Sequence, residues 1–198
     1  MQNIEGIGKL IGRTVISVES ANKVGHVNDL LCDPLTGKLA GFSVETPDKT
    51  SALVSIIDVR GIGRDAVMIE HDNSLVLAEA SPLNGVPRAK GNLIGVKVIT
   101  EHGQLLGAIS DVSLCLLREP VFVYEVRSSI FDKLLGHAFY FGASLGCAFS
   151  DDSSSLVVCD YSDAMEHSLE AAARRILGSI EVMLQDPAAI NIQIRSHA

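Results

Sequence analysis

The stretch VGHVNDLLCDPLTGKLAGFSV, residues 24–44, contains the pattern that decides the fold. Two runs rich in apolar residues, Val24–Asp33 and Lys38–Val44, flank the segment DPLTG. In such a turn, Asp favours the first position, Pro presets φ at the second and Gly supplies a positive φ at the end. The stretch therefore predicts a β-hairpin.

Further strands are predicted on both sides of this hairpin. Thr14–Val18 is rich in β-branched residues, and Ala52–Val59 and Ala66–Glu70 are short runs rich in apolar residues. Five or six short strands within about 75 residues are typical of a small barrel, because closure removes exposed sheet edges. We therefore expect residues 1–80 to form a small antiparallel β-barrel.

The chain then repeats itself. LIGRTVI at residues 10–16 recurs as LIGVKVI at residues 93–99, and VGHVNDL at residues 24–30 recurs as LGAISDV at residues 106–112. The separation is 83 residues for the first pair and 82 for the second. Internal repetition of this length predicts two copies of one structural unit.

The second, divergent barrel is expected at residues 93–161, after a linker at residues 81–92 whose Pro and Gly content is typical of a boundary. The second copy has seven more residues between Val126 and Leu156 than the first copy has over the equivalent stretch, Val44 to Val67. The extra residues fall in the apolar run 134–149. That run is shorter than the roughly 20 apolar residues of a spanning helix, so we expect core strands there.

A helix is predicted after the second barrel, over residues 162–186. Its apolar residues recur at helical spacing, and Asp163 with Glu166 three residues later fits a capping box at its start. An amphipathic stripe most often packs on its own core, and a dimer or partner interface is the alternative.

The tail, residues 187–198, has the alternation of a strand, because Ile190, Ile192 and Ile194 are separated by polar residues. Such a strand closes its own barrel or adds to the sheet edge of a neighbour. The fold class predicted for the whole chain is therefore mainly β, with two tandem small antiparallel barrels followed by an amphipathic helix and a short terminal strand.

Composition argues against direct nucleic-acid binding. The 198 residues carry 16 Lys and Arg against 24 Asp and Glu, for a net charge of -8, whereas a phosphate-binding protein usually has a basic face. Aromatic residues make up 5% and Trp is absent, which disfavours stacking on single strands. The N-terminus shows no secretory signal, so we expect a cytoplasmic protein with reduced cysteines.

Two motifs with chemical meaning lack the structural context that their chemistry needs. GASLG at residues 142–146 matches the G-x-S-x-G of hydrolases, but no alternation of strands and helices surrounds it. GIGRDA at residues 61–66 fits a dinucleotide-binding pattern, but a strand follows it instead of a helix. The cysteines and histidines show no metal-binding spacing. We therefore expect no catalytic, cofactor-binding or metal-binding residues.

Four segments of the first copy resemble the PRC-barrel domain, which the photosynthetic reaction-centre H subunit and the ribosome maturation factor share. They are IGR at residues 11–13, VGHVND at 24–29, DPLTGK at 33–38 and DVRGIGRDAV at 58–67. The resemblance covers most of residues 5–79 and reaches residues 91–160 through the repeat, where AFSDD at 148–152 replaces GIGRD. It implies a non-catalytic adaptor barrel that binds other proteins.

The most favoured function is therefore a non-enzymatic adaptor or scaffold for a partner protein or complex, with a photosynthetic or membrane-associated assembly as one setting. The alternatives are a ribosome-assembly or RNA-processing factor that binds a ribosomal protein, and a small-ligand sensor or enzyme. Peripheral membrane association and a homodimer both remain open. The candidate contact residues are apolar or aromatic: Phe139, Tyr140, Phe141, Ile176, Ile180, Met183, Ile192 and Ile194. For the three aromatic residues, core burial is the competing interpretation.

Overall fold

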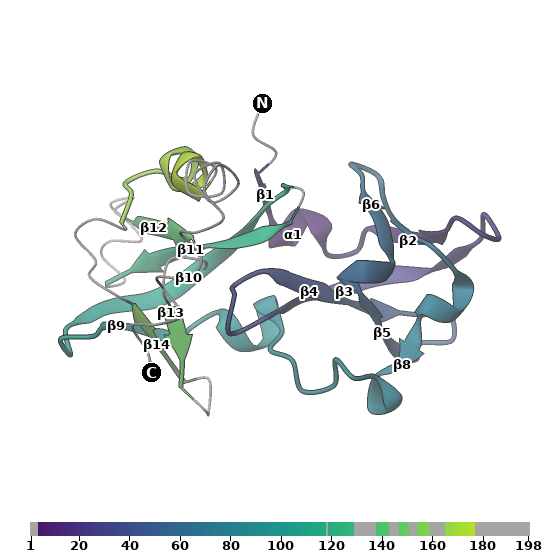
Figure 1. Cartoon of the computed structure of the whole chain (residues 1–198), viewed down its shortest axis with the longest axis horizontal. Helices are drawn as coiled ribbons and strands as arrows, with labels where there is room; N and C mark the ends of the chain where they lie inside the picture. The colour runs from purple at the N-terminus through teal and green to yellow at the C-terminus, as the bar shows by residue number, and fades with distance from the viewer. Residues whose placement is uncertain are drawn as a thin grey trace, which may run out of the picture.

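The computed structural model describes residues 4–117, 119–128, 138–142, 147–150, 154–158 and 165–176. They form two seven-stranded β-sheets that lie side by side along the long axis of the molecule (Figure 1). The described helices are few and short. The chain is therefore mainly β, as the sequence predicts.

The first sheet has the strand order β6-β7-β2-β3-β4-β5-β8. Its strands are β2 (Thr14–Ser17), β3 (Lys23–Cys32), β4 (Leu39–Glu45), β5 (Ser51–Ser55), β6 (Val59–Ile62), β7 (Ala66–Ile69) and β8 (Val76–Leu77). Short helical turns accompany them: α1 (Ile7–Leu10) before β2, and η1 (Ile56–Asp58), η2 (Asp72–Ser74) and η3 (Ala78–Ala80) after β5.

The predicted hairpin is confirmed, because β3 and β4 pair antiparallel around DPLTG. The Asp33 carboxylate accepts hydrogen bonds from the Leu35 N–H at 3.0 Å and from the Thr36 hydroxyl at 2.6 Å. Gly37 ends the turn with φ of 63°, in the left-handed region that glycine adopts without a steric cost. The turn chemistry read from the sequence thus sets the local structure.

The second sheet has the order β12-β11-β10-β9-β14-β13, with β1 paired to β10 in addition. Its strands are β1 (Ile4–Gly6), β9 (Lys97–Thr100), β10 (Leu105–Cys115), β11 (Val121–Arg127), β12 (Phe139–Gly142), β13 (Cys147–Phe149) and β14 (Ser155–Val158). The π-helical turn η4 (Ala89–Leu93) precedes β9.

The repeat in the sequence recurs in the backbone hydrogen bonds. The Gly12 N–H donates to the Val27 carbonyl at 2.7 Å, and the Gly95 N–H donates to the Ile109 carbonyl at 2.8 Å. Both glycines have positive φ, 84° and 90°. The two sheets are therefore built on the same local plan.

Each sheet also contains a parallel strand pair, where the sequence analysis expects only antiparallel pairing. In β2 and β7, Val15 lies opposite Val67; in β9 and β14, Val98 lies opposite Leu156. The seven extra residues of the second copy lie between β11 and β14. Among the described residues, strand pairing leaves both sheets open at their ends.

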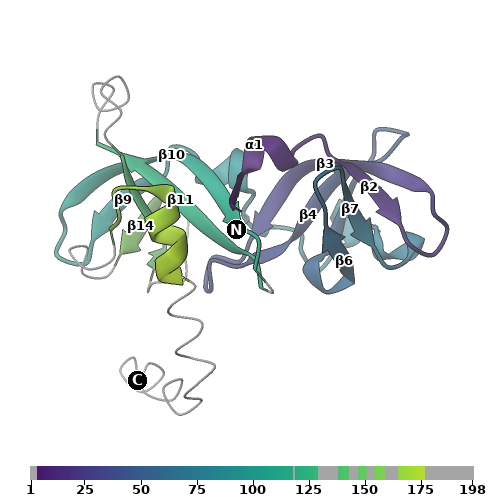
Figure 2. The same cartoon turned by 90° about the horizontal axis from the view of Figure 1, so that it is seen from above.

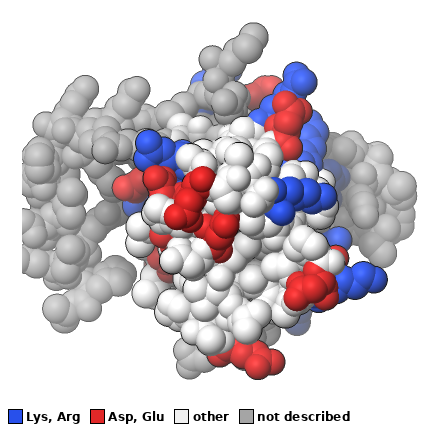
Figure 3. Space-filling model, turned by 90° about the vertical axis from the view of Figure 1, so that its right-hand side faces the viewer, with Lys and Arg blue, Asp and Glu red and all other residues white. Residues whose placement is uncertain are grey.

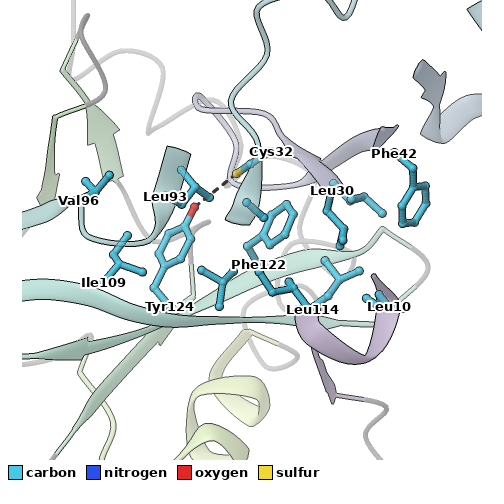
Figure 4. Close-up of a cluster of buried hydrophobic side chains, with 14 of the residues drawn as sticks. Leu10, Leu30, Cys32, Phe42, Leu93, Val96, Ile109, Leu114, Phe122 and Tyr124 are labelled. Carbon is cyan, nitrogen blue, oxygen red and sulfur yellow. Dashed lines mark hydrogen bonds between the residues drawn. The ribbon is translucent and has the colours of Figure 1, made fainter. Parts of the chain in front are cut away.

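One continuous hydrophobic core fills the space between the two sheets. Leu30 and Phe42 of the first sheet and Phe122 and Tyr124 of the second are all fully buried in it (Figure 4). The Tyr124 hydroxyl lies 3.4 Å from the Cys32 sulfur. The two halves of the chain therefore share their interior.

The halves also exchange backbone contacts at their starts. Gly6 of β1 pairs with Ser113 of β10, and Arg88, before η4, forms a bridge with Leu31 of β3. In Figures 1 and 2, β1 and α1 lie where the two halves meet. Each half thus contributes its first segment to the sheet of the other.

Residues 81–92, expected as a linker, pack against the first sheet. The Pro87 carbonyl accepts the Cys32 N–H at 2.9 Å. The Asp29 carboxylate, buried in β3, accepts the N–H groups of Lys90 and Gly91 at 3.0 and 3.1 Å. These bonds satisfy backbone donors at the start of η4, which have no partner within the turn.

The outer faces of the two sheets are covered differently. On the first sheet, Leu83 lies over Gly41 of β4: a Cβ added to Gly41 would lie 3.2 Å from the Leu83 side chain. On the second sheet, Ala172, Ala173 and Ile176 of a helix over residues 169–176 pack on the outer face of β10 and β11. Figure 2 shows this helix beside the two strands.

The predicted helix is confirmed over residues 169–176, but its predicted start is wrong. Glu166, expected in the first turn, instead forms a β-bridge with Tyr140. The Ser168 hydroxyl accepts the Ala171 N–H at 3.2 Å, so Ser168 caps the helix. Residues 162–164 and 177–186 of the predicted helix, and the predicted tail strand, lie outside the described residues.

Candidate functional site

The three aromatic candidates lie on β12, at one end of the second sheet. Phe141 is 3% exposed, and its ring meets that of Tyr124 edge-on with centroids 5.4 Å apart. Phe139 and Tyr140 are partly exposed, and the Phe139 ring lies 5.8 Å from that of His167. Phe141 thus belongs to the core, while the other two keep some surface.

Tyr140 is also held by a polar cluster. Its hydroxyl donates to Glu125 at 3.0 Å, and Glu125 also accepts hydrogen bonds from Arg127 at 2.6 Å and Ser110 at 2.9 Å. Partial burial alone would raise the pKa of Glu125, but these hydrogen bonds lower it overall. The cluster ties β12 to β10 and β11.

The helix and tail candidates have no described surface to offer a partner. Ile176 is fully buried against the second sheet. Ile180, Met183, Ile192 and Ile194 lie outside the described residues, so their proposed contacts stay predictions.

An apolar surface that remains partly exposed lies on the parallel pair β2 and β7. We call it the open face and define it by Ile16, Val18, Ala66 and Met68. Ile16 and Met68 lie opposite each other in the pair, and Val18 follows the end of β2 with 47% of its surface exposed. Val15, Val67 and Ile69, which alternate with these residues, are buried in the core. Because side chains alternate between the two faces of a strand, the residues of the open face point outward.

Four acidic residues border the open face where β2 and β7 end: Glu19, Asp58, Glu70 and Asp72. We call them the acidic rim. The Glu19 N–H donates to the Glu70 carbonyl at 3.2 Å, and the Glu70 N–H donates to the Asp58 carbonyl at 2.9 Å. The Asp72 N–H donates to the Glu19 carboxylate at 3.3 Å. Because parallel strands end at the same edge, these residues come together there.

The acidic rim carries more negative than positive charge. Arg60 lies 3.4 Å from Glu70, His71 lies 3.6 Å from Glu19, and Lys23 lies opposite Ile16 of the open face. The nearby Ser17 hydroxyl, and the Ser20 hydroxyl, which donates to the Asp72 carboxylate at 2.7 Å, lower the pKa of Asp72. Figure 3 views the right-hand end of Figure 1 and shows acidic and basic side chains around a broad uncharged area.

Two further findings concern metal and membrane features. Among the described residues, His, Cys, Asp and Glu side chains form no group of three or more that could hold a metal ion. In the same part of the chain, no helix combines the length and the apolar character needed to cross a membrane.

The open face and the acidic rim lie in a segment that matches a known family. A comparison with protein-family models matches residues 3–76 to the PRC-barrel domain. The chain contains a PRC-barrel domain. The match confirms the resemblance for the first half, since it runs from β1 to the start of β8. The second half of the chain repeats the strand plan of the first. No curated protein matches the chain.

The open face is not among the features predicted from the sequence. A signal is present in TVISV at residues 14–18 and AVMI at residues 66–69, because each run places apolar residues on both faces of a strand. In a strand with one face in solvent, apolar residues alternate with polar ones. That pattern is typical of a strand whose second face is also covered, by the same chain or by a partner.

Proposed function

We propose that the chain is a non-enzymatic scaffold that recruits or stabilises a partner protein through its PRC-barrel domain. The presence of this domain fits a protein-interaction role. The observation that carries the proposal is the open face, because Ile16 and Met68 on paired strands, and Val18 just after β2, keep apolar surface exposed. Exposed apolar surface bordered by polar residues is typical of protein-interaction sites.

The shared core supports the same proposal. Two sheets with one interior and exchanged first segments form one body, in which β2 and β7 are held on both sides. A surface on paired strands loses little conformational entropy when a partner binds. The open face is therefore well suited to binding.

Affinity purification of the tagged full chain from its native cells, with identification of the recovered proteins, tests the proposal. A specific protein or complex that is enriched over a tag-only control supports it. Recovery of the chain alone, from the soluble and the membrane fraction alike, contradicts it.

The same experiment separates the settings that the sequence leaves open. A photosynthetic or membrane-associated assembly would be recovered from the membrane fraction. Ribosomal proteins enriched at low salt would favour the ribosome-assembly alternative, which fits the net charge of -8 because ribosomal proteins are basic. The cytoplasmic location stays a prediction, which cell fractionation tests.

A further inference from the structure

We propose that the open face is the docking surface for a partner segment that carries apolar side chains on one side and Lys or Arg at one end. This inference rests on the proposed scaffold function and adds the chemistry of the partner. It follows from the geometry of the open face, the charge of the acidic rim and the contrast with the second sheet.

The apolar part of the surface is continuous. Ile16 lies opposite Met68 across the parallel pair, and Val18 extends the row beyond the end of β2. Ala66, partly exposed, continues it on β7 towards the start of the strand. A row of this kind matches a segment whose side chains on one side are all apolar.

The acidic part of the surface lies at one end of that row. Glu19 is the residue after Val18, and Glu70 is two residues after Met68 on the neighbouring strand. The Glu19 side chain, 3.6 Å from His71, is 57% exposed, and the Glu70 side chain, 3.4 Å from Arg60, is 40% exposed. Their carboxylates are therefore accessible to a cation that the docked segment places at this end.

The negative charge of the acidic rim favours a basic segment at the open face. A basic segment gains from the excess of carboxylates at the acidic rim, both in encounter rate and in orientation. A second copy of this chain is a less suitable occupant, because it has a net charge of -8 and is repelled at long range. We therefore commit to a basic segment of another protein.

The second sheet provides a matched comparison. Ile99 and Val157 form the equivalent outward pair on β9 and β14. At the positions that follow, the repeat replaces Val18 by Glu101 and Glu19 by His102. The equivalent surface thus has a shorter apolar row, and the residue equivalent to Glu19 is not a carboxylate.

Binding of a synthetic probe to the full chain tests the inference. The probe is a peptide of alternating Val and Lys, and its control is a peptide of alternating Val and Glu of the same length. Binding is measured by NMR titration and by fluorescence anisotropy. We expect the basic peptide to shift the amide signals of β2 and β7 and the acidic peptide to shift none.

Variants then locate the site. Val18→Asp is expected to weaken binding of the basic peptide about tenfold or more, because it places a charge against an apolar contact. Its matched control, Val157→Asp, changes a partly exposed valine on the second sheet and is expected to change affinity less than about twofold. Glu19→Gln with Glu70→Gln is expected to weaken binding and to reduce its dependence on salt.

Three outcomes overturn the inference: the basic peptide fails to bind, both valine variants weaken it equally, or the acidic peptide binds as well. Dimers of the wild type that Val18→Asp dissociates would also overturn it, in favour of a second copy. Far-UV circular dichroism and thermal unfolding confirm that each variant is folded. If affinity purification recovers a partner with the wild type and equally with Val18→Asp, the scaffold function is supported and the open face is not its docking surface.

Discussion

The Cys32 sulfur of β3 lies 3.4 Å from the Tyr124 hydroxyl of β11, so this contact joins the two sheets within their common core (Figure 4). Tyr124 is also packed edge-on against Phe141 and Phe149 of its own sheet. Tyr124 is thus one of the residues that connect the PRC-barrel domain to the rest of the chain. The structure therefore predicts that the two halves unfold together.

Substitution of Tyr124 tests this cooperativity. Tyr124→Phe removes the hydroxyl and is expected to lower the free energy of unfolding by about 1 kcal/mol. Tyr124→Ala leaves a cavity and is expected to cost about 3–5 kcal/mol. Calorimetry should show one transition in the wild type and in both variants. Two separate transitions, of which only one shifts in Tyr124→Ala, would contradict a shared core.

Asp29 and Asp111 form a matched pair at equivalent positions of the repeat. Each carboxylate accepts the next N–H along its strand at 2.8 Å, but Asp29 is 6% exposed and also binds Lys90 and Gly91, whereas Asp111 is exposed. Asp29→Ala leaves buried N–H groups without a partner and should cost about 2–3 kcal/mol. Asp111→Ala should cost less than about 1 kcal/mol. Equal losses in urea unfolding would show that the contacts to η4 add nothing.

The Cys32 thiol predicts a loss of stability at high pH. Burial raises its pKa from 9.0 to about 12. Between these values the unfolded thiol is ionised and the folded one is not, so the unfolded chain binds fewer protons. The contribution of this thiol to the free energy of unfolding should therefore fall by about 1.4 kcal/mol for each pH unit in this window.

Urea unfolding of the wild type and of Cys32→Ala, at several pH values from about 8 to about 11, measures this effect. Other groups titrate in both proteins, so only the difference between the two curves reports on Cys32. We expect the difference in stability to shrink as the pH rises. A difference that stays constant would mean that the thiol is not protected by burial.

Two glycines of the repeat are expected to resist substitution. A Cβ at Gly25 would lie 2.5 Å from the Glu45 carbonyl oxygen, and one at Gly107 would lie 2.3 Å from that of Arg127. Gly25→Ala and Gly107→Ala should each cost about 1–3 kcal/mol, because the paired strand must move. Gly8→Ala is the control, since a Cβ added there would meet nothing within 4 Å and the φ of Gly8 is not positive. A loss in Gly8→Ala as large as in the other two would contradict this explanation.

The parts of the fold that the sequence predicts are those with a local or a repeated signal. Asp33, Pro34 and Gly37 specify their turn through their own conformational preferences, and the repeat identifies the second copy without any contact being known. The parallel pairing of β2 with β7 joins segments about 50 residues apart, and no local preference encodes it.

The helix start and the open face show where local patterns mislead. Asp163 and Glu166 match a capping box, but the Glu166 backbone pairs with Tyr140, so Ser168 caps the helix instead. In Thr14–Ser17, adjacent apolar residues point to opposite faces, and periodicity does not say which face a partner covers. Both outcomes depend on contacts between segments far apart in the chain.

The central claim is that the PRC-barrel domain recruits a partner through the open face. Quantitative affinity purification from native cells, with wild type, Val18→Asp and Val157→Asp expressed at equal levels, tests it most directly. The account predicts that wild type and Val157→Asp recover the same partner in similar amounts and that Val18→Asp recovers about a tenth or less. Equal recovery by all three proteins would contradict the claim.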